Sequence, residues 1–241
     1  MEEKICRHKN LVELTHRHKQ CSDCGVWKGT REDAHHYSME YYTNKVFGLF
    51  DACIPKRTIN SEYYKFTHFK NLEIDTTQMR KILEIGGGVC QTSYSLALEG
   101  KDVIVVESSQ WATKWMKESY GERNGFKIID ANFENVDKSL IGKDFDFIFA
   151  NHVFEHLVDP MTAIEYCYDI LVDNGKFFLI VPNQEREKNM HHTHEWAFSI
   201  DVLKKWFEQV GFKDIKIQEF PGSVEEVKQL GGAHIRIVGT K

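Results

Sequence analysis

Short apolar runs alternate with helix-length segments from Arg80 to the end of the chain. The runs are rich in β-branched residues and predict strands, at residues 81–85, 103–107, 127–129, 145–150 and 176–181. Between them, apolar residues recur every three or four positions and predict helices, at residues 91–99, 110–120, 160–171 and 199–210. This alternation predicts βαβ units on a parallel sheet with helices on both faces, the doubly wound α/β class.

The two ends of the chain depart from this alternation. Residues 215–220 and 234–239 predict an antiparallel pair of strands at the sheet edge. An aromatic stretch at 37–54 predicts a helix that Pro55 ends, either a lid over the site or an ordinary packed helix. The predicted parts are a cysteine-rich segment, a helical lid or linker and a cofactor-binding domain, at residues 1–30, 31–79 and 80–241.

The composition is that of an ordinary globular protein, with 41% hydrophobic residues, 28% charged residues and a formal net charge of −5. The acidic balance does not favour a nucleic-acid partner, although a local basic patch can bind phosphate. The polar N-terminus lacks the apolar core of a secretory signal, and no apolar run reaches the roughly 18–20 residues of a membrane span. We expect a cytoplasmic protein with no membrane partner.

The first predicted strand runs directly into Gly86, Gly87 and Gly88. Glycines at the carboxyl end of a buried strand let the backbone turn sharply and let a ligand touch the main chain. The next helix begins near Gln91 and points its N–H groups at that space. Nicotinamide and flavin enzymes use the same device, so the turn by itself predicts a nucleotide site without naming the nucleotide.

Two acidic residues at the ends of the next two predicted strands indicate how the ribose and the base of the nucleotide are bound. Glu107 follows the glycines by about twenty residues, a position from which a carboxylate accepts hydrogen bonds from both ribose hydroxyls. Asp130 ends the third strand and is placed to accept from an adenine amino group, with Phe133 packing on the ring. The alternative for Asp130 is a helix or turn cap.

Several motifs in residues 80–220 occur in the order and spacing of a known family. They are Glu84-Ile-Gly-Gly-Gly, Val106-Glu107-Ser108, Asp130-Ala131 and the segments 145–160 and 171–183. On these motifs the chain resembles the class I methyltransferases of the type 11 and type 23 groups, although Asp173-Asn174 stands where the family has Pro-Gly. The resemblance implies a mostly parallel, seven-stranded, Rossmann-like sheet and S-adenosylmethionine as cofactor.

The resemblance also implies which residues hold the cofactor. In the family, Glu84 and the glycines bind its methionine part. The implied cofactor-binding residues are Glu84, Gly86, Gly87, Gly88, Glu107, Ser108, Asp130, Ala131 and Asn151. Against a dinucleotide, Gln91 stands where the nicotinamide fingerprint has its final glycine.

Histidines gather after the fourth and fifth predicted strands, at the ligand-facing end of the sheet. A hydroxyl acceptor must lose a proton when it is methylated, and an imidazole is a suitable base. The candidate catalytic residues are His152, His156, His192 and His194. As alternatives, Glu155-His156 fixes the loop structure, and residues 191–194 form a substrate clamp, a metal site or a solvated polar loop.

A metal is a further alternative for the first of these histidine groups. His152, Glu155 and His156 lie at i, i+3 and i+4 and are predicted to share one helix face. With His152 in place of a glutamate, they resemble the metal-dependent motif of ubiquinone-pathway O-methyltransferases. The resemblance implies a catalytic divalent metal, and the change of ligand type weakens it.

The N-terminal segment contains a candidate zinc site. Cys6, His8, Cys21 and Cys24 supply three thiolates and one imidazole, a set that completes a tetrahedral zinc site. A site with four protein ligands has no open position and is structural. The alternative is a set of unligated cysteines, since Cys6 and His8 are closer together than usual. C-methyltransferases acting on nucleotide-linked deoxysugars begin with a similar small zinc module.

The leading functional prediction is transfer of a methyl group from S-adenosylmethionine to a hydroxyl of a small molecule, such as a sugar or a glycan precursor. Basic residues near the cysteines, between Lys4 and Arg31, support a second hypothesis, methylation of an RNA or protein target docked on the zinc segment. A third hypothesis is a cofactor-binding scaffold without turnover. The sequence leaves the acceptor and the oligomeric state open.

Overall fold

The computed structural model describes residues 10–15, 18–22, 27–29, 69–121, 124–183, 194–220 and 234–241. The chain divides into two compact units. One combines Met1–His35 with Ala150–Lys241, and the other is His36–Phe149. The three parts expected from the sequence, with boundaries near 30 and 79, stay a prediction. The helix expected at 37–54 lies outside the described residues.

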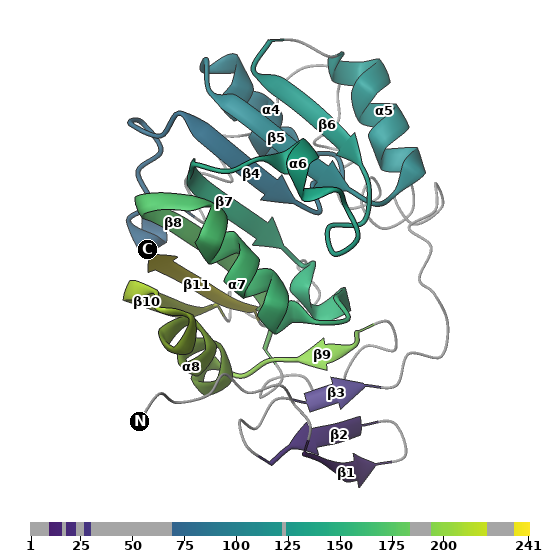
Figure 1. Cartoon of the computed structure of the whole chain (residues 1–241), viewed down its shortest axis with the longest axis vertical. Coiled ribbons are helices and arrows are strands. Elements are labelled where there is room, and N and C mark those ends of the chain that lie inside the picture. The colour runs from purple at the N-terminus through teal and green to yellow at the C-terminus, as the bar shows by residue number, and fades with distance from the viewer. Residues whose placement is uncertain are drawn as a thin grey trace. The chain divides into compact units, whose positions relative to one another are not determined.

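Seven strands form one mostly parallel sheet in the order β10-β11-β8-β7-β4-β5-β6 (Figure 1). Their bounds are β4 (Lys81–Ile85), β5 (Asp102–Glu107), β6 (Phe126–Asp130), β7 (Phe145–Asn151), β8 (Leu171–Pro182), β10 (Lys213–Phe220) and β11 (His234–Thr240). β4 and β6 each pair with β5 in parallel, whereas β11 is antiparallel to both β10 and β8. The expected α/β class and its antiparallel strands at the sheet edge are confirmed.

In the unit His36–Phe149, two helices pack against the parallel strands. α4 (Gln91–Leu98) contacts β5, and α5 (Gln110–Tyr120) contacts β6 (Figure 1). β4 and β5 are almost continuous apolar runs because both of their faces are buried. The Ser109 hydroxyl accepts the N–H of Ala112 at 3.3 Å and caps α5, so this helix begins where its sequence predicts.

In the other unit, α7 (Pro160–Ile170) and α8 (Ile200–Val210) accompany the antiparallel strands (Figure 1). α8 packs on β10 and β11. The approach is close at Gly239, where an added Cβ would lie 2.9 Å from the Phe207 ring and 2.8 Å from the Cβ of Phe212. A strand without a side chain at this position therefore lets the aromatic face of α8 reach the sheet.

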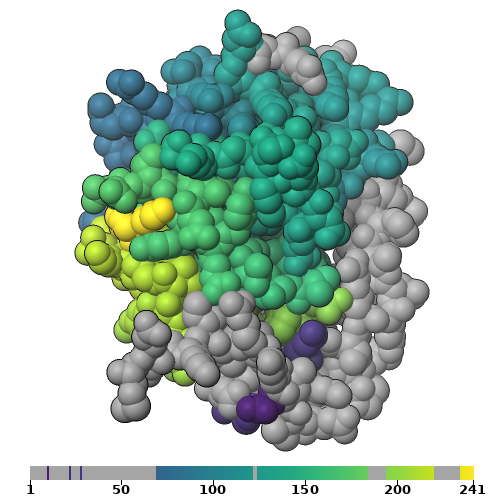
Figure 2. Space-filling model, viewed as in Figure 1, coloured from purple at the N-terminus to yellow at the C-terminus, as the bar shows by residue number. Residues whose placement is uncertain are grey.

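A second, four-stranded sheet joins the N-terminal segment to a short strand late in the chain. Its order is β1-β2-β3-β9, with β1 at Leu11–Thr15, β2 at His18–Cys21, β3 at Trp27–Gly29 and β9 at Trp196–Ala197. β3 and β9 are antiparallel. In Figure 2 some of the purple atoms from the N-terminal part of the chain lie beside yellow-green atoms from late in the chain. The sequence did not predict this sheet.

Elsewhere the observed elements differ little from the predicted ones. β8 begins at Leu171 instead of 176, because the N–H of Asn174 donates to the Lys241 carbonyl and the Lys241 N–H to that of Gly175. Asn174 has a φ of 64°, so it turns as Asn and Gly can in place of Pro-Gly. The short helices that were not predicted are α6 (Lys138–Ile141) and the 3₁₀ helix η3 (Lys70–Leu72). Where a helix carrying His152, Glu155 and His156 was predicted, the structure has the short 3₁₀ helix η4 (Phe154–His156). Within the described ranges, no helix is both long and apolar enough to cross a membrane.

Candidate active site

The glycine turn after β4 has no room for side chains. Gly86 and Gly88 take φ angles of 69° and 54°, in the left-handed region that favours glycine. The Gly86 N–H donates to the Val106 carbonyl at 2.8 Å and anchors the turn to β5. At Gly87 an added Cβ would overlap the Val105 side chain and lie 3.1 Å from the Cβ of Cys90. The three glycines are half-buried and carry no side chain, so their main chain stays partly accessible at the end of a buried strand.

Glu107, at the end of β5, holds this turn in place. One carboxylate oxygen accepts the N–H of Gly88 at 2.8 Å, and the other accepts the N–H of Ser109 at 2.7 Å. The pKa of Glu107 is raised above its ordinary value, mainly by burial and to a smaller extent by the negative charge of Asp130. The hydrogen bonds from backbone N–H groups oppose this rise. Each oxygen keeps a second lone pair, so this carboxylate can also accept from ligand hydroxyls.

Glu84 is a buried carboxyl with an unfilled hydrogen-bonding position. Its side chain is 7% exposed, and its Oε2 has no hydrogen-bond partner in the part of the chain that the structure describes. Burial, with the negative charge of Glu107 adding to it and the Ser93 hydroxyl opposing it, raises the pKa of Glu84 to about 8. A cationic ligand group beside Glu84 would favour the ionised carboxylate and supply the missing partner.

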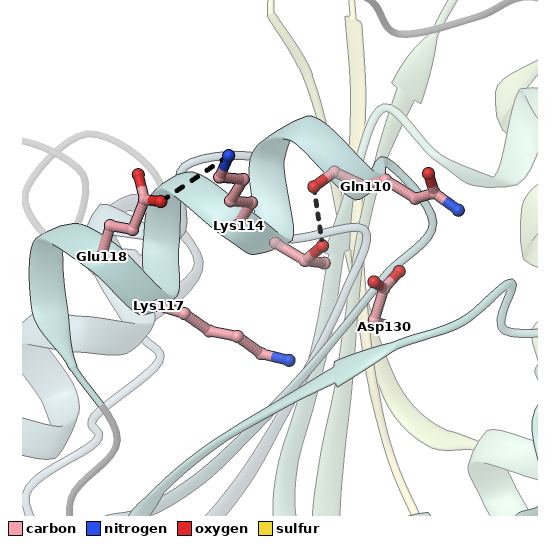
Figure 3. A pocket seen from close by; sticks show the side chains of 6 residues that line it. Gln110, Lys114, Lys117, Glu118 and Asp130 are labelled. Carbon is pink, nitrogen blue, oxygen red and sulfur yellow. Dashed lines mark hydrogen bonds and ion pairs between the residues drawn. The ribbon is translucent and has the colours of Figure 1, made fainter.

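Asp130 lies at the edge of a polar pocket. The pocket has a volume of about 380 Å³ and is lined by Gln110, Thr113, Lys114, Lys117, Glu118 and Asp130 (Figure 3). The exposed Asp130 carboxylate caps no helix or turn within the described residues, which leaves its ligand-binding alternative open. Phe133 is buried, and the Lys138 ammonium stands 4.7 Å from the centre of its ring. Its packing on adenine stays a prediction.

The other unit contains a buried glutamate among histidines. Glu155 is fully buried, and its Oε1 lies 3.0 Å from His152 Nδ1. Since an ionised carboxylate only accepts, His152 donates its Nδ1–H. The Nε2 of His156 lies 4.0 Å from the same oxygen, and the rings of His156 and His194 meet edge to face at 4.9 Å. Glu155, His156 and His194 each offer a ligand atom, and these atoms lie within 4.8 Å of one another.

The pKa of Glu155 reflects this surrounding. Burial alone would raise the pKa, but the hydrogen bond from His152 and the charges of His152, His156 and His194 outweigh it and lower the pKa to about 2. The carboxylate is therefore ionised at neutral pH although no solvent reaches it. Its second oxygen, Oε2, has no hydrogen-bond partner among the described residues.

The local backbone differs from the helix face expected for the first histidine group. His152 precedes η4 and takes a φ of 54°, with its N–H donating to the Ile180 carbonyl at 3.0 Å. His152 and Glu155 still meet, because the left-handed turn, not a regular helix, directs the imidazole at the carboxylate. The ring of His234, at the start of β11, packs edge to face on His152 at 4.6 Å. The sequence analysis missed His234, because only the strand pairing brings it to this position.

Main-chain contacts bring His194 to Glu155. The N–H of Glu195 donates to the Glu155 carbonyl at 2.7 Å, and the buried indole N–H of Trp196 donates to the Leu157 carbonyl at 2.7 Å. Trp196 also starts β9, which pairs with β3, and the Lys28 ammonium stands 4.9 Å from its ring. Residues Glu195 and Trp196 are therefore bonded to the segment 155–157 on one side and, through β9, to β3 on the other.

The structure describes some of the remaining predicted site residues and not others. Asn151 ends β7 and is half-buried, while Ser108 is exposed and the Ala131 N–H donates to the Glu107 carbonyl at 3.0 Å. His192 lies outside the described residues, as do Cys6, His8 and Cys24. Of the four zinc candidates only the backbone of Cys21 is described, at the end of β2.

Comparison with known proteins adds a family match and a set of similar folds. A model of the methyltransferase domain family matches residues 50–217. A search of the curated proteins found no match. A solved S-adenosylmethionine-dependent methyltransferase from Archaeoglobus fulgidus is 17% identical, with a TM-score of 0.61, over 82% of this chain and 100% of that one.

Two further solved structures contain small ligands. The 1,6-didemethyltoxoflavin-N1-methyltransferase of Burkholderia thailandensis, with 1,6-didemethyltoxoflavin and S-adenosylhomocysteine bound, is 14% identical over 96% of this chain and 99% of that one, with a TM-score of 0.57. The N-terminal domain of EvdMO1, in the presence of S-adenosylhomocysteine and D-fucose, is 14% identical over 77% and 84%, with a TM-score of 0.56. At these identities the structures share the fold with this chain.

Proposed function

Since the chain belongs to the methyltransferase domain family and is an S-adenosylmethionine-dependent methyltransferase, we propose that it methylates a hydroxyl oxygen of a small molecule, such as a sugar or a glycan precursor. The observation that carries the choice of oxygen is the contact between His152 and the buried, ionised Glu155. An alcohol is a poor nucleophile until its proton is removed, so its methylation calls for a base.

The residues of the unit His36–Phe149 fit S-adenosylmethionine. Glu84, buried and lacking a partner at Oε2, suits the cationic amino end of the cofactor. We assign Glu107 and Ser108 to the ribose hydroxyls and Asp130 with Ala131 to adenine. The main chain at the three glycines would contact the methionine part. Asn151, which belongs to the other unit, stays a predicted cofactor-binding residue.

The cofactor supplies a methyl group that its positive sulfonium has already activated. The protein then has to orient the acceptor, exclude water and receive one proton. His152 donates Nδ1–H to Glu155, which fixes the tautomer that presents Nε2 as an acceptor. We propose His152 as the base that takes the hydroxyl proton and Glu155 as its positioning residue. His156, His192 and His194 stay predicted to orient the acceptor.

The sugar class has narrower support. The EvdMO1 domain was solved in the presence of D-fucose, and several histidines with a carboxylate can hydrogen-bond to a polyol. An amine that is already neutral attacks through its lone pair and can lose its proton after the methyl transfer, whereas a hydroxyl needs a base during the attack. The His152–Glu155 pair therefore favours a hydroxyl over a neutral amine.

The proposal is tested by methyl transfer to matched acceptors. We would incubate the protein with methyl-labelled S-adenosylmethionine and pairs of sugars that differ by a hydroxyl or an amine, and locate the label by mass spectrometry. We expect O-methylated products. His152→Gln should lower kcat by about 100-fold or more while the cofactor Kd stays unchanged. N-methylated products, or a His152→Gln protein with the wild-type rate, would contradict the proposal.

For the N-terminal segment we propose a structural zinc ion bound by Cys6, His8, Cys21 and Cys24. The support is the set of three thiolates and one imidazole in the sequence. Cys21→Ser should lower the zinc content and the free energy of unfolding and leave cofactor affinity unchanged. Equal zinc content in wild type and variant would remove this assignment.

A further inference from the structure

We infer that Glu155, His156 and His194 form a second binding centre, for a divalent transition-metal ion of the zinc class. The three ligand atoms lie within 4.8 Å of one another, although they come from two segments that are distant in the chain. This centre is separate in its ligands from the four cysteine and histidine positions of the N-terminal segment. It also differs from the i, i+3, i+4 set that the sequence predicts, because His194 takes the place of His152.

The buried carboxylate is the first reason for a cation. Glu155 has no exposed surface, its Oε1 accepts from His152, and its Oε2 has no hydrogen-bond partner within the described residues. A carboxylate without solvent is costly unless it is paired and hydrogen-bonded, and the single hydrogen bond from His152 compensates only in part. A divalent ion bound to this carboxylate would complete the compensation.

The backbone around the three side chains is the second reason. The Glu195 N–H donates to the Glu155 carbonyl, and two residues beyond His194 the indole N–H of Trp196 donates to the Leu157 carbonyl. These bonds hold the two segments together before any ion binds. Less conformational freedom is then lost on binding, which favours affinity.

The donor set selects the kind of ion. Imidazole nitrogen suits zinc, nickel, cobalt and copper, whereas magnesium and calcium prefer oxygen ligands. Three protein ligands leave one position of a tetrahedral zinc site open. His152 stays outside the ligand set and orients the Glu155 carboxylate through its Nδ1–H, as partners of metal-binding carboxylates commonly do.

The test must separate this centre from the proposed cysteine site. We would prepare the full chain with Cys21→Ser, remove metal with a chelator, and titrate Zn²⁺ by calorimetry and Co²⁺ by absorption spectroscopy. We expect one ion per chain, with a Co²⁺ spectrum lacking the thiolate charge-transfer band. Adding His194→Ala or Glu155→Gln should weaken binding by about tenfold or more, whereas His152→Ala, beside the centre, should weaken it less.

A Cys21→Ser protein that binds no ion, or one whose affinity is the same with and without His194→Ala, overturns the inference. Should Cys21→Ser fail to fold, wild type and His194→Ala are compared directly, and the expected result is one ion fewer in the variant at equal circular dichroism. Equal ion numbers there would also overturn it. Methyl transfer is assayed separately, so loss of the proposed activity in His152→Gln with metal binding retained distinguishes the two proposals.

Discussion

Cofactor affinity should rise steeply with pH because Glu84 has to ionise when the cofactor binds. Burial raises the pKa of Glu84 to about 8, so this carboxyl is mostly protonated in the free protein at neutral pH. The amino group of S-adenosylmethionine is cationic and stabilises the carboxylate beside it. Binding should therefore release a proton from Glu84.

The size of the effect follows from the pKa. With a free-protein pKa of about 8, roughly 1% of Glu84 is ionised at pH 6 and about half at pH 8. If Glu84 is ionised throughout in the bound form, its ionisation alone lowers the cofactor Kd about 50-fold between these values, or about 2 kcal/mol. Loss of the amino proton by about half of the free cofactor at pH 8 reduces this to about 25-fold. The cofactor's own α-amino group titrates near 8, so the rise should level off there.

The assay is calorimetric titration with S-adenosylmethionine and S-adenosylhomocysteine from pH 6 to 8, in pairs of buffers with different ionisation enthalpies. Near pH 7 we expect a net release of about 0.8 proton per cofactor bound, about 0.9 from Glu84 less about 0.1 taken up by the cofactor's amino group. Glu84→Gln is the matched control, because it keeps the shape of the protonated side chain and cannot release a proton. A wild-type Kd that does not change with pH, with no proton released, would refute the assignment of Glu84.

The same burial affects the ligand-free protein. The folded-state pKa of Glu84 lies above its ordinary value of 4.5. Between pH 4.5 and about 8 the native protein therefore retains a proton that the unfolded chain has already lost. This contribution to stability is present below pH 4.5 and is lost as the pH rises through about 8. In urea unfolding, Glu84→Gln should therefore gain stability relative to wild type between pH 5 and pH 8.

Three further substitutions test the site and its support. Gly87→Ala should cost about 1–3 kcal/mol in urea unfolding, since its methyl overlaps Val105, and Val105→Ala in the same chain should recover part of the loss. Glu107→Ala should weaken cofactor binding by about 1–3 kcal/mol in calorimetry, and an unchanged Kd would remove it from the ribose site. Trp196→Phe should cost about 1–3 kcal/mol of unfolding free energy, because the buried Leu157 carbonyl loses its donor, and equal stability would show that this bond does not hold the loop.

The main sheet could be predicted because its signals are local. β4 and β5 are short β-branched runs buried on both faces, and α5 has its cap and its apolar spacing within a dozen residues. The glycine turn is equally local, since positive φ at Gly86 and Gly88 restricts the residue type directly. Glu84 was identified by resemblance, but its raised pKa depends on its burial and, to a smaller extent, on the negative charge of Glu107, which no pattern in the sequence reports.

The second sheet could not be predicted from local signals. β9 is two residues long, and neither its propensity nor its periodicity separates it from a loop. It is a strand only because β3, from the start of the chain, pairs with it. Its pairing depends on contacts over more than a hundred residues of chain, and such contacts are decided by packing in three dimensions.

By itself, the sequence determined the doubly wound sheet, the glycine turn and the acidic residues that end its strands, because each depends on neighbours in the chain. Which histidines lie near Glu155 depends on the three-dimensional packing. In the sequence, His156 is close to His152, and His194 is close to His192. In the structure, the hydrogen bonds from the Glu195 N–H to the Glu155 carbonyl and from the Trp196 indole to the Leu157 carbonyl bring His194 beside Glu155. The burial of Glu155 places a charged carboxylate away from solvent. This burial results from packing of the whole fold and cannot be read from any one segment of the sequence.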